Sequence, residues 1–208
     1  DMGINLQNED IDMLANAQRK LVKKSLLLYS GGLDSTVLLH ELRPALALFI
    51  SYGQRHKKEY DKAKEHCEKL GITLLDRKIE LAGGVADEGE AFICPIRNLV
   101  FLSLAANLAI EHDCNQITIG CNLTDKELFP DCRPGFLEYV RHAIISSGYD
   151  LRVEAPFIMV DKAEIGERAK KIGITPESVW SCYKGGDEPC GECVACEENP
   201  FFSGKKIS

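Results

Sequence analysis

Short apolar runs alternate along this chain with longer segments of helical pattern, and this alternation constrains the fold more than any other feature. Runs such as LLLY and ALALFI are apolar throughout, which is typical of strands buried on both faces of a parallel sheet. The alternation predicts an α/β fold with a doubly wound, mostly parallel sheet and helices on both of its faces. Strands are predicted at 25–29, 45–50, 72–75, 78–81, 116–120 and 151–155, and helices at 11–22, 34–42, 57–70, 98–112, 134–147 and 161–173.

The size and charge of the chain narrow its possible functions. With 208 residues it is long enough to bury a core without disulfides. Its 32 acidic and 25 basic residues give a net charge of −7, which counts against a polynucleotide-binding protein because phosphate contacts need a basic footprint. No apolar run approaches the about 20 residues of a membrane span, and the polar start is unlike a secretory signal. We therefore expect a cytoplasmic protein with neither nucleic-acid nor membrane partners.

A glycine-rich turn, SGGLDST at 30–36, joins the first predicted strand to the first predicted helix. Two glycines let the main chain approach a ligand closely, and the unpaired N–H groups of a helix start attract anions. The turn lacks the lysine of a Walker loop and the spacing of a dinucleotide fingerprint. It predicts a pyrophosphate site; the alternative is a plain turn in which Asp34 or Ser35 acts as the helix N-cap.

Four of the nine cysteines crowd into fifteen residues near the end of the chain, in the pattern C-x7-C-x2-C-x2-C. Four soft ligands without a histidine fit a closed, structural Zn²⁺ site formed by Cys182, Cys190, Cys193 and Cys196. An iron–sulfur cluster is the alternative, although the spacing is not one of the common ferredoxin runs. The chain then divides into a helical extension at 1–24, a main domain at 25–175 and a zinc-binding segment at 176–208 that packs on the main domain.

The turn resembles the PP-loop of the N-type ATP pyrophosphatases, whose fold is that of the adenine nucleotide alpha hydrolases. Members of that superfamily adenylate a substrate oxygen, release pyrophosphate and let a nitrogen or sulfur nucleophile displace AMP. The resemblance implies that Ser30, Asp34 and Ser35 are catalytic. It also implies that ATP is bound by Tyr29, Ser30, Gly31, Gly32, Leu33, Asp34, Ser35 and Thr36.

The turn and the cysteines together resemble the 7-cyano-7-deazaguanine synthase family of queuosine biosynthesis. The matching words include SYGQRH at 51–56, PIRN at 95–98, PDCR at 130–133 and WSCY at 180–183. The resemblance implies a ligase that forms C–N bonds: it converts 7-carboxy-7-deazaguanine, with ammonia and two ATP, into the nitrile through an amide. It further implies Mg²⁺ with the ATP, and a homodimer.

The matching words also supply the candidate substrate-binding residues. A purine-like acid needs hydrogen-bond partners for its edge and a cation for its carboxylate, which a planar guanidinium suits. Some of these residues have plain alternatives: Asn98 and Asp131 as helix caps, Arg97 as a solvated charge, and Arg55 and His56 as loop residues. The candidates are Tyr52, Gln54, Arg55, His56, Arg97, Asn98, Asp131 and Arg133.

The chain departs from the family beside one of these words. Lys126–Phe129 replaces the Tyr-Ser-Gly-Tyr that the family usually carries before Pro130, so the acceptor is less defined than the adenylation. The alternatives are a relative that joins another carboxylate to another amine, including a protein or peptide, a tRNA-modifying PP-loop enzyme, and an inactive zinc-stabilised binding module. The acidic balance argues against the tRNA enzyme, and the intact turn argues against the inactive module.

Overall fold

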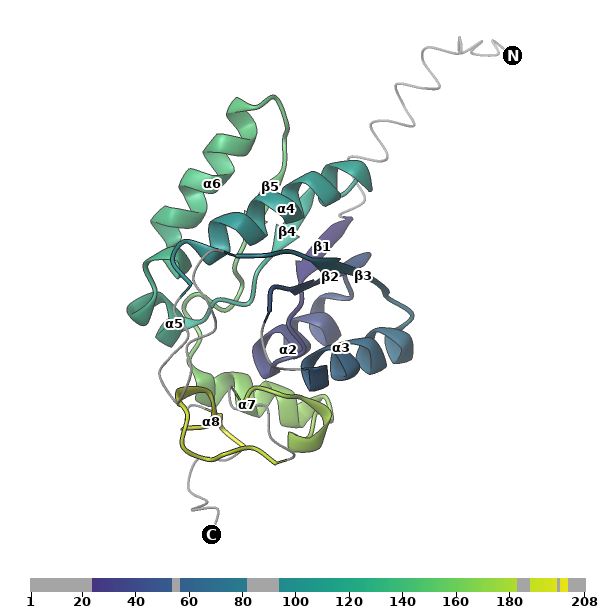
Figure 1. Ribbon diagram of the computed structural model, residues 1–208, viewed down its shortest axis with the longest axis vertical. Coiled ribbons are helices and arrows are strands. Elements are labelled where there is room, and N and C mark those ends of the chain that lie inside the picture. The colour runs from purple at the N-terminus through teal and green to yellow at the C-terminus, as the bar shows by residue number, and fades with distance from the viewer. Residues whose placement is uncertain (1–23, 54–56, 82–93, 183–187, 198, 202–208) are drawn as a thin grey trace, which may run out of the picture.

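A five-stranded parallel sheet forms the centre of the molecule (Figure 1). The computed structural model describes residues 24–53, 57–81, 94–182, 188–197 and 199–201. The spatial order of the strands is β3-β2-β1-β4-β5, so the chain moves outward from β1 on one side and then restarts on the other. The strands are β1 (Ser25–Leu28), β2 (Leu46–Ser51), β3 (Thr73–Lys78), β4 (Gln116–Thr118) and β5 (Arg152–Glu154).

Alternate residues of the central strands enter two different cores. Leu26 and Leu48 pack beneath α4 and α6, whereas Leu27 and Phe49 pack beneath α2, α3 and α7. Figure 1 shows these two groups of helices on opposite faces of the sheet. This arrangement confirms the predicted doubly wound α/β fold. The helices are α2 (Leu33–Leu42), α3 (Lys57–Leu70), α4 (Arg97–Glu111), α5 (Leu123–Leu128), α6 (Pro134–Ser146), α7 (Lys162–Lys171) and α8 (Val194–Glu197), with 3₁₀ turns η1 (Pro130–Cys132) and η2 (Pro176–Ser178).

The reversal of strand order lies between β1 and β4, and this is where ligands bind in open parallel sheets. The loop after β1 and the loop after β4 meet there. Gly120 lies so close to α2 that a Cβ on it would be 3.5 Å from the main-chain nitrogen of Ser35. The topology therefore places the glycine turn and the residues that follow β4 at one edge of the sheet.

Several predicted elements differ from the structure. The two short strands predicted at 72–75 and 78–81 are one edge strand, β3, which pairs with β2 along its whole length. Its polar residues Asp76 and Lys78 are exposed, which interrupts the apolar run without interrupting the strand. Helix α5 was not predicted, and α4 begins one residue early, after Ile96 in a left-handed conformation (φ 52°). The helix predicted at 11–22 lies outside the described residues.

The described part of the cysteine segment, residues 176–182, 188–197 and 199–201, contacts the glycine turn, α3 and α7. The main-chain N–H of Trp180 donates to the carbonyl of Gly31, at 3.3 Å. Pro200 lies against α7, where a Cβ on Gly166 would come within 2.6 Å of its Cγ atom. No described helix has the length and apolar character needed to cross a bilayer. The segment is thus attached both to the glycine turn and to α7.

Candidate functional site

Ser30 and Ser35 shape the glycine turn by bonding to each other and to its main chain. The hydroxyl of Ser35 donates to the carbonyl of Gly32 (3.2 Å) and accepts the main-chain N–H of Ser30 (3.3 Å). The Ser30 hydroxyl accepts the N–H of Gly32 (3.2 Å) and lies 3.0 Å from the Ser35 hydroxyl. Because Ser35 has donated its proton to Gly32, Ser30 is the donor between the two hydroxyls. The turn is therefore held by bonds that need no ligand.

Gly31 has a conformation and surroundings that require glycine. Its φ is 78°, and a Cβ there would lie 2.4 Å from the main-chain oxygen of Glu59 in α3. Its own carbonyl accepts the N–H of Trp180. The turn is thus pressed between the start of α3 and the start of the cysteine segment.

The N-terminus of α2 has no side-chain cap. Gly32 is the N-cap residue, and no side chain bonds to the free N–H groups of the first turn. The alternative in which Asp34 or Ser35 is the N-cap is therefore wrong. Uncapped N–H groups and the positive end of the helix dipole form an anion site, which suits a phosphate.

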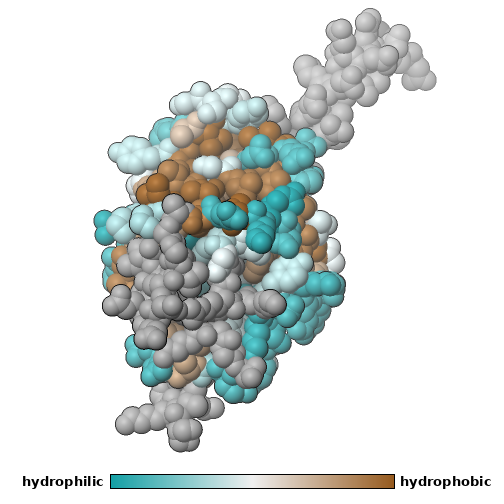
Figure 2. All heavy atoms as spheres, viewed as in Figure 1, coloured by the Kyte–Doolittle hydropathy of each residue, from teal (hydrophilic) through white to brown (hydrophobic). Residues whose placement is uncertain are grey.

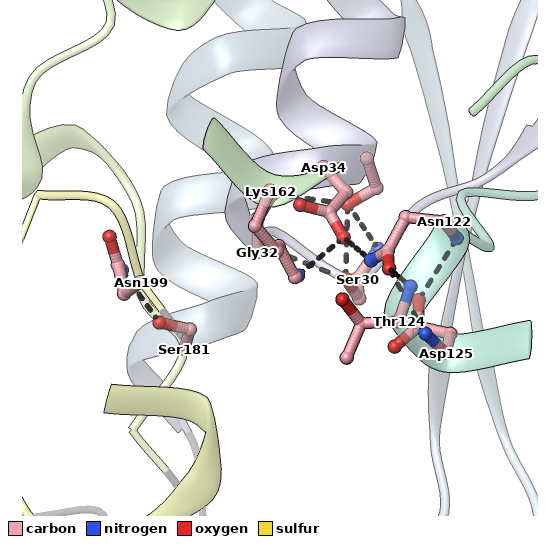
Figure 3. Close-up of polar contacts among 10 residues, drawn as sticks. Ser30, Gly32, Asp34, Asn122, Thr124, Asp125, Lys162, Ser181 and Asn199 are labelled. Atoms are coloured by element: carbon pink, nitrogen blue, oxygen red, sulfur yellow. Dashed lines mark hydrogen bonds and ion pairs between the residues drawn. The ribbon is translucent and has the colours of Figure 1, made fainter. Parts of the chain in front are cut away.

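Asp34 projects from this first turn toward the neighbouring loops (Figure 3). Its Oδ2 accepts the Lys162 ammonium at 2.7 Å and the side-chain amide of Asn122 at 2.8 Å. Its Oδ1 is buried and has no hydrogen-bond partner among the described residues. An unpartnered buried carboxylate oxygen costs free energy unless a ligand meets it. The chemistry of this oxygen fits a hard cation such as Mg²⁺.

Three of the predicted ATP-binding residues point their side chains into the core. Tyr29, Leu33 and Thr36 are buried, and the Tyr29 hydroxyl lies 3.2 Å from the Thr36 hydroxyl. Burial raises the pKa of Tyr29 above its usual range. These side chains support the turn from beneath, so a nucleotide contact from them would use the main chain.

A second polar group lies beyond the end of β2. Arg97 donates to the Tyr52 hydroxyl at 3.1 Å, and its guanidinium lies 5.6 Å from the centre of the Tyr52 ring and 5.8 Å from that of Phe101. Burial raises the pKa of Glu59 to about 8, and the attraction of Arg97 acts in the opposite direction. Burial also raises the pKa of Tyr52, again opposed by Arg97. Arg97 therefore interacts with the Tyr52 hydroxyl and with a carboxyl group that burial keeps largely protonated below about pH 8.

Asn98, in the first turn of α4, forms hydrogen bonds with Asp131 and Cys132 of η1. The Asp131 carboxylate accepts the main-chain N–H of Asn98 (3.2 Å), and the Asn98 amide donates to the carbonyl of Asp131 (3.3 Å) and to the Cys132 sulfur (3.2 Å). Asp131 thus satisfies a donor at the start of α4 and does not cap the helix at Pro134, which was the plain alternative to its predicted substrate role. Arg133 is exposed, and its Nε donates to the carbonyl of Lys126 at 3.3 Å.

Sequence reasoning missed three residues of this site, and the catalytic and binding roles of all its candidates remain predictions. Asn122, Lys162 and Glu59 were not assigned, although Asn122 and Lys162 follow β4 and β5 at the carboxyl edge, which was the signal available. Glu59 carried no comparable signal. Gln54, Arg55 and His56 lie outside the described residues, so their substrate role stays untested.

The four cysteine sulfurs converge at the other end of the site. All four Sγ atoms lie within 4.8 Å of one another, and those of Cys190 and Cys196 are 3.9 Å apart. Tetrahedral Zn²⁺ with Zn–S bonds of about 2.3 Å places its sulfurs about 3.8 Å apart. A [4Fe-4S] cluster spreads its ligands farther, because each thiolate binds a different iron. The donor set and spacing therefore form a metal site that fits a single ion.

Comparison with solved structures places the fold. A U34-tRNA thiolase, NcsA, from Methanococcus maripaludis, solved with a [4Fe-4S] cluster, has 17% identity and a TM-score of 0.51 over 83% of this chain and 66% of its own. A 4-thiouridine synthetase, solved with RNA and ATP, has 18% identity and a TM-score of 0.52 over 86% of this chain and 47% of its own. The chain shares the PP-loop fold of these proteins.

Sequence comparison identifies the family. The 7-cyano-7-deazaguanine synthase of Psychromonas ingrahamii is 32% identical over 201 residues, covering 85% of this chain and 90% of the relative. Those of Methanoregula boonei and Marinobacter nauticus are 33% and 34% identical over 84% and 83% of this chain, covering 91% and 88% of the relatives. The model for queuosine biosynthesis protein QueC matches residues 24–89 and 72–200. The chain is therefore an enzyme that belongs to the QueC family of queuosine biosynthesis.

Proposed function

We propose that this enzyme converts 7-carboxy-7-deazaguanine into 7-cyano-7-deazaguanine, using ammonia and two ATP, through an amide. The observation that carries the proposal is the arrangement at the β1–β4 edge: an uncapped helix N-terminus, the Lys162 ammonium and a buried Asp34 oxygen that has no hydrogen-bond partner among the described residues. This set of groups suits the phosphates of ATP with their cation. Relatives with the same named activity cover most of the chain.

The reaction proceeds through two activations at one nucleotide site. The substrate carboxylate attacks the α-phosphorus of ATP and releases pyrophosphate; ammonia then attacks the acyl carbon, and AMP and a proton leave. The amide oxygen attacks a second ATP in the same way, and loss of AMP and two protons gives the nitrile. The N–H groups of the α2 N-terminus and Lys162 would stabilise the charge that develops on the departing pyrophosphate.

Asp34 would hold the Mg²⁺ that accompanies ATP. Oxygen ligands at short distance suit this ion, and Oδ1 of Asp34 is the buried oxygen that lacks a partner. Mg²⁺ neutralises phosphate charge during phosphoryl and nucleotidyl transfer. Asn122 and Lys162 keep Oδ2 occupied, so that Oδ1 is the oxygen presented to a ligand.

The acid substrate would lie between the nucleotide turn and the group around Arg97. Arg97 is held against Tyr52 and Phe101, which fixes its guanidinium plane for a carboxylate. Arg133 is the second candidate cation, and Lys126 lies beside it through its carbonyl. Gln54, Arg55 and His56 are proposed to complete this region.

The four cysteines would bind one structural Zn²⁺. Four protein ligands leave no open position for a water molecule, so the ion has no catalytic role. Trp180 and its hydrogen bond to Gly31 connect the cysteine segment to the nucleotide turn.

A cytoplasmic homodimer is also part of the proposal. Figure 2 shows apolar residues gathered over the face that carries α4 and α6, and exposed Ile96, Leu99 and Val100 belong to the α4 region.

The test is incubation of the purified, zinc-loaded protein with 7-carboxy-7-deazaguanine, ATP, Mg²⁺ and ammonia. Mass spectrometry should detect the amide and then the nitrile, with two AMP formed for each nitrile. AMP formation that depends on another carboxylate, and not on this one, would identify a relative with a different acceptor. No AMP with any acid would reject the adenylating function.

A further inference from the structure

Asn122 is fully buried and uses both ends of its side-chain amide (Figure 3). Its Oδ1 accepts the main-chain N–H groups of Thr124 (2.8 Å) and Asp125 (3.0 Å), which caps α5. Its Nδ2 donates to Oδ2 of Asp34 at 2.8 Å. The partners determine the orientation of this amide, because a main-chain N–H can only donate and an ionised carboxylate can only accept.

We propose that Asn122 is a positioning residue that couples the nucleotide turn to the acceptor segment 122–133. The inference rests on the nucleotide site proposed above. One side chain fixes both the plane of the Asp34 carboxylate and the first turn of α5. A shift of either partner therefore displaces the other.

Lys162 alone would not fix the Asp34 carboxylate. An ammonium is a compact charge on a flexible stem with rotating donors, and the terminal torsion of aspartate is broad. The planar amide of Asn122 is itself anchored by two main-chain bonds, so its N–H has a defined direction. Together the two donors keep Oδ2 engaged and leave Oδ1 facing the ligand.

The other end of α5 connects to the proposed acceptor residues. The carbonyl of Lys126 accepts Nε of Arg133 at 3.3 Å, and the Lys126 ammonium lies 3.2 Å from the sulfur of Met159. Because α5 has only six residues, its N-cap sets the position of most of its length. Asn122 is thus placed to transmit the state of the nucleotide turn to Arg133.

Two substitutions at Asn122 keep the oxygen that caps α5 but remove the N–H that donates to Asp34. Asn122→Asp keeps the N-cap oxygen, since aspartate caps as well as asparagine, but places a carboxylate against Asp34. Asn122→Ser keeps a cap hydroxyl but is too short to reach Asp34. The matched control is Asn107→Asp, the same chemical change at an exposed position on α4.

The experiment measures stabilisation of each purified variant by ATP with Mg²⁺, beside the unfolding midpoint without nucleotide. We expect the apparent affinity of Asn122→Asp and of Asn122→Ser for ATP to fall about 10- to 100-fold. Asn107→Asp should bind ATP as the wild type does. Both Asn122 variants should also raise the KM for 7-carboxy-7-deazaguanine.

Each other result counts against the inference. Asn122 variants that bind ATP as the wild type does overturn it. If the Asn122 variants bind ATP more weakly but keep the wild-type KM for 7-carboxy-7-deazaguanine, the proposed coupling to α5 is wrong. If ATP does not stabilise the wild-type chain itself, the proposed nucleotide site fails and the inference fails with it.

Discussion

The glycine turn and the cysteine segment contact each other at Trp180, yet different interactions hold them in shape. The turn is built from hydrogen bonds among Ser30, Gly32 and Ser35, above a buried helix. The cysteine segment has a small apolar cluster around Trp180, a helix of four residues and four sulfurs that face one another. The comparison indicates that the turn is shaped by the protein alone, whereas the segment would take its shape from the proposed metal.

Metal removal should give the largest effect, because it acts on the region with the smaller core. We expect one zinc per chain, and its removal by a chelator should lower the unfolding midpoint by about 10 °C, equivalent to about 4 kcal/mol for a chain of this size. Cys196→Ser should lose zinc and lower the unfolding midpoint in the same way. Cys114→Ala, which changes a buried cysteine in the core beneath α4 and α6, should keep its zinc. Iron with visible absorbance, or less than about half an equivalent of zinc, would contradict this expectation.

Asp34→Ala, in the glycine turn, should reduce activity strongly and stability only slightly, the opposite of metal removal. AMP formation should fall by more than about 100-fold, because the buried ligand-facing oxygen is lost. The free energy of unfolding should change by less than about 2 kcal/mol, since the hydrogen bonds of the turn do not involve this side chain. Urea unfolding and AMP assays measure the two effects. Asp150→Ala, at an exposed position, is the control. A variant that unfolds, or that forms AMP at the normal rate, would remove the contrast.

Glu59 lies beside the glycine turn, because its main chain packs on Gly31. Its side chain should make the stability of this region depend on pH. Its pKa is raised to about 8 in the folded chain, so the folded state holds a proton that the unfolded state has released. The resulting stability is present below about pH 4.5 and is lost as the pH rises through 8. Glu59→Gln should therefore be more stable than the wild type at pH 8.5, by about 2 kcal/mol, with a smaller difference at pH 5.

Thermal unfolding across this pH range measures the difference. Glu68→Gln, at an exposed carboxylate on the same helix, should leave the pH dependence unchanged. A wild-type stability that rises between pH 5 and pH 8.5 and is unaffected by Glu59→Gln would contradict the raised pKa.

Gly166→Ala should weaken the attachment of the cysteine segment to α7. A Cβ at this position would overlap Pro200, at 2.6 Å and 2.7 Å from two of its carbons, which should destabilise the chain by about 1 kcal/mol. Gly135→Ala in α6 meets nothing within 4 Å and should stabilise by about 0.5 kcal/mol. Chemical unfolding of both variants decides between these signs. If both variants change the free energy of unfolding equally, Pro200 moves aside without a loss of stability.

The sequence predicted the fold well where each strand is apolar on both faces. The runs at β1 and β2 identify buried parallel strands, and the predicted turn lies between β1 and α2. The polar edge strand β3 was divided in two because the apolar pattern is interrupted by residues that face solvent. Helix α5 was missed because it is short, has no buried residue and is defined by its cap at Asn122.

The candidate site was predictable where the residues are neighbours in the chain. The turn and the four cysteines could be found from spacing, and the structure brings the cysteine sulfurs together. The partners of Asp34 come from other loops, so their contact depends on strand order, which local patterns do not contain. The bonds of Asp131 depend on the packing of η1 on α4 in the same way.

The contacts of Asp34 also have a consequence for synthesis on the ribosome. Asn122 is 88 residues and Lys162 is 128 residues farther along the chain. At about 5–20 residues per second, Lys162 is added roughly 6 to 26 seconds after Asp34. A nascent chain that has already formed β1 and α2 therefore carries the turn without the groups that orient its carboxylate. The proposed nucleotide site is therefore incomplete on a growing chain until Lys162 has been added and has left the ribosome.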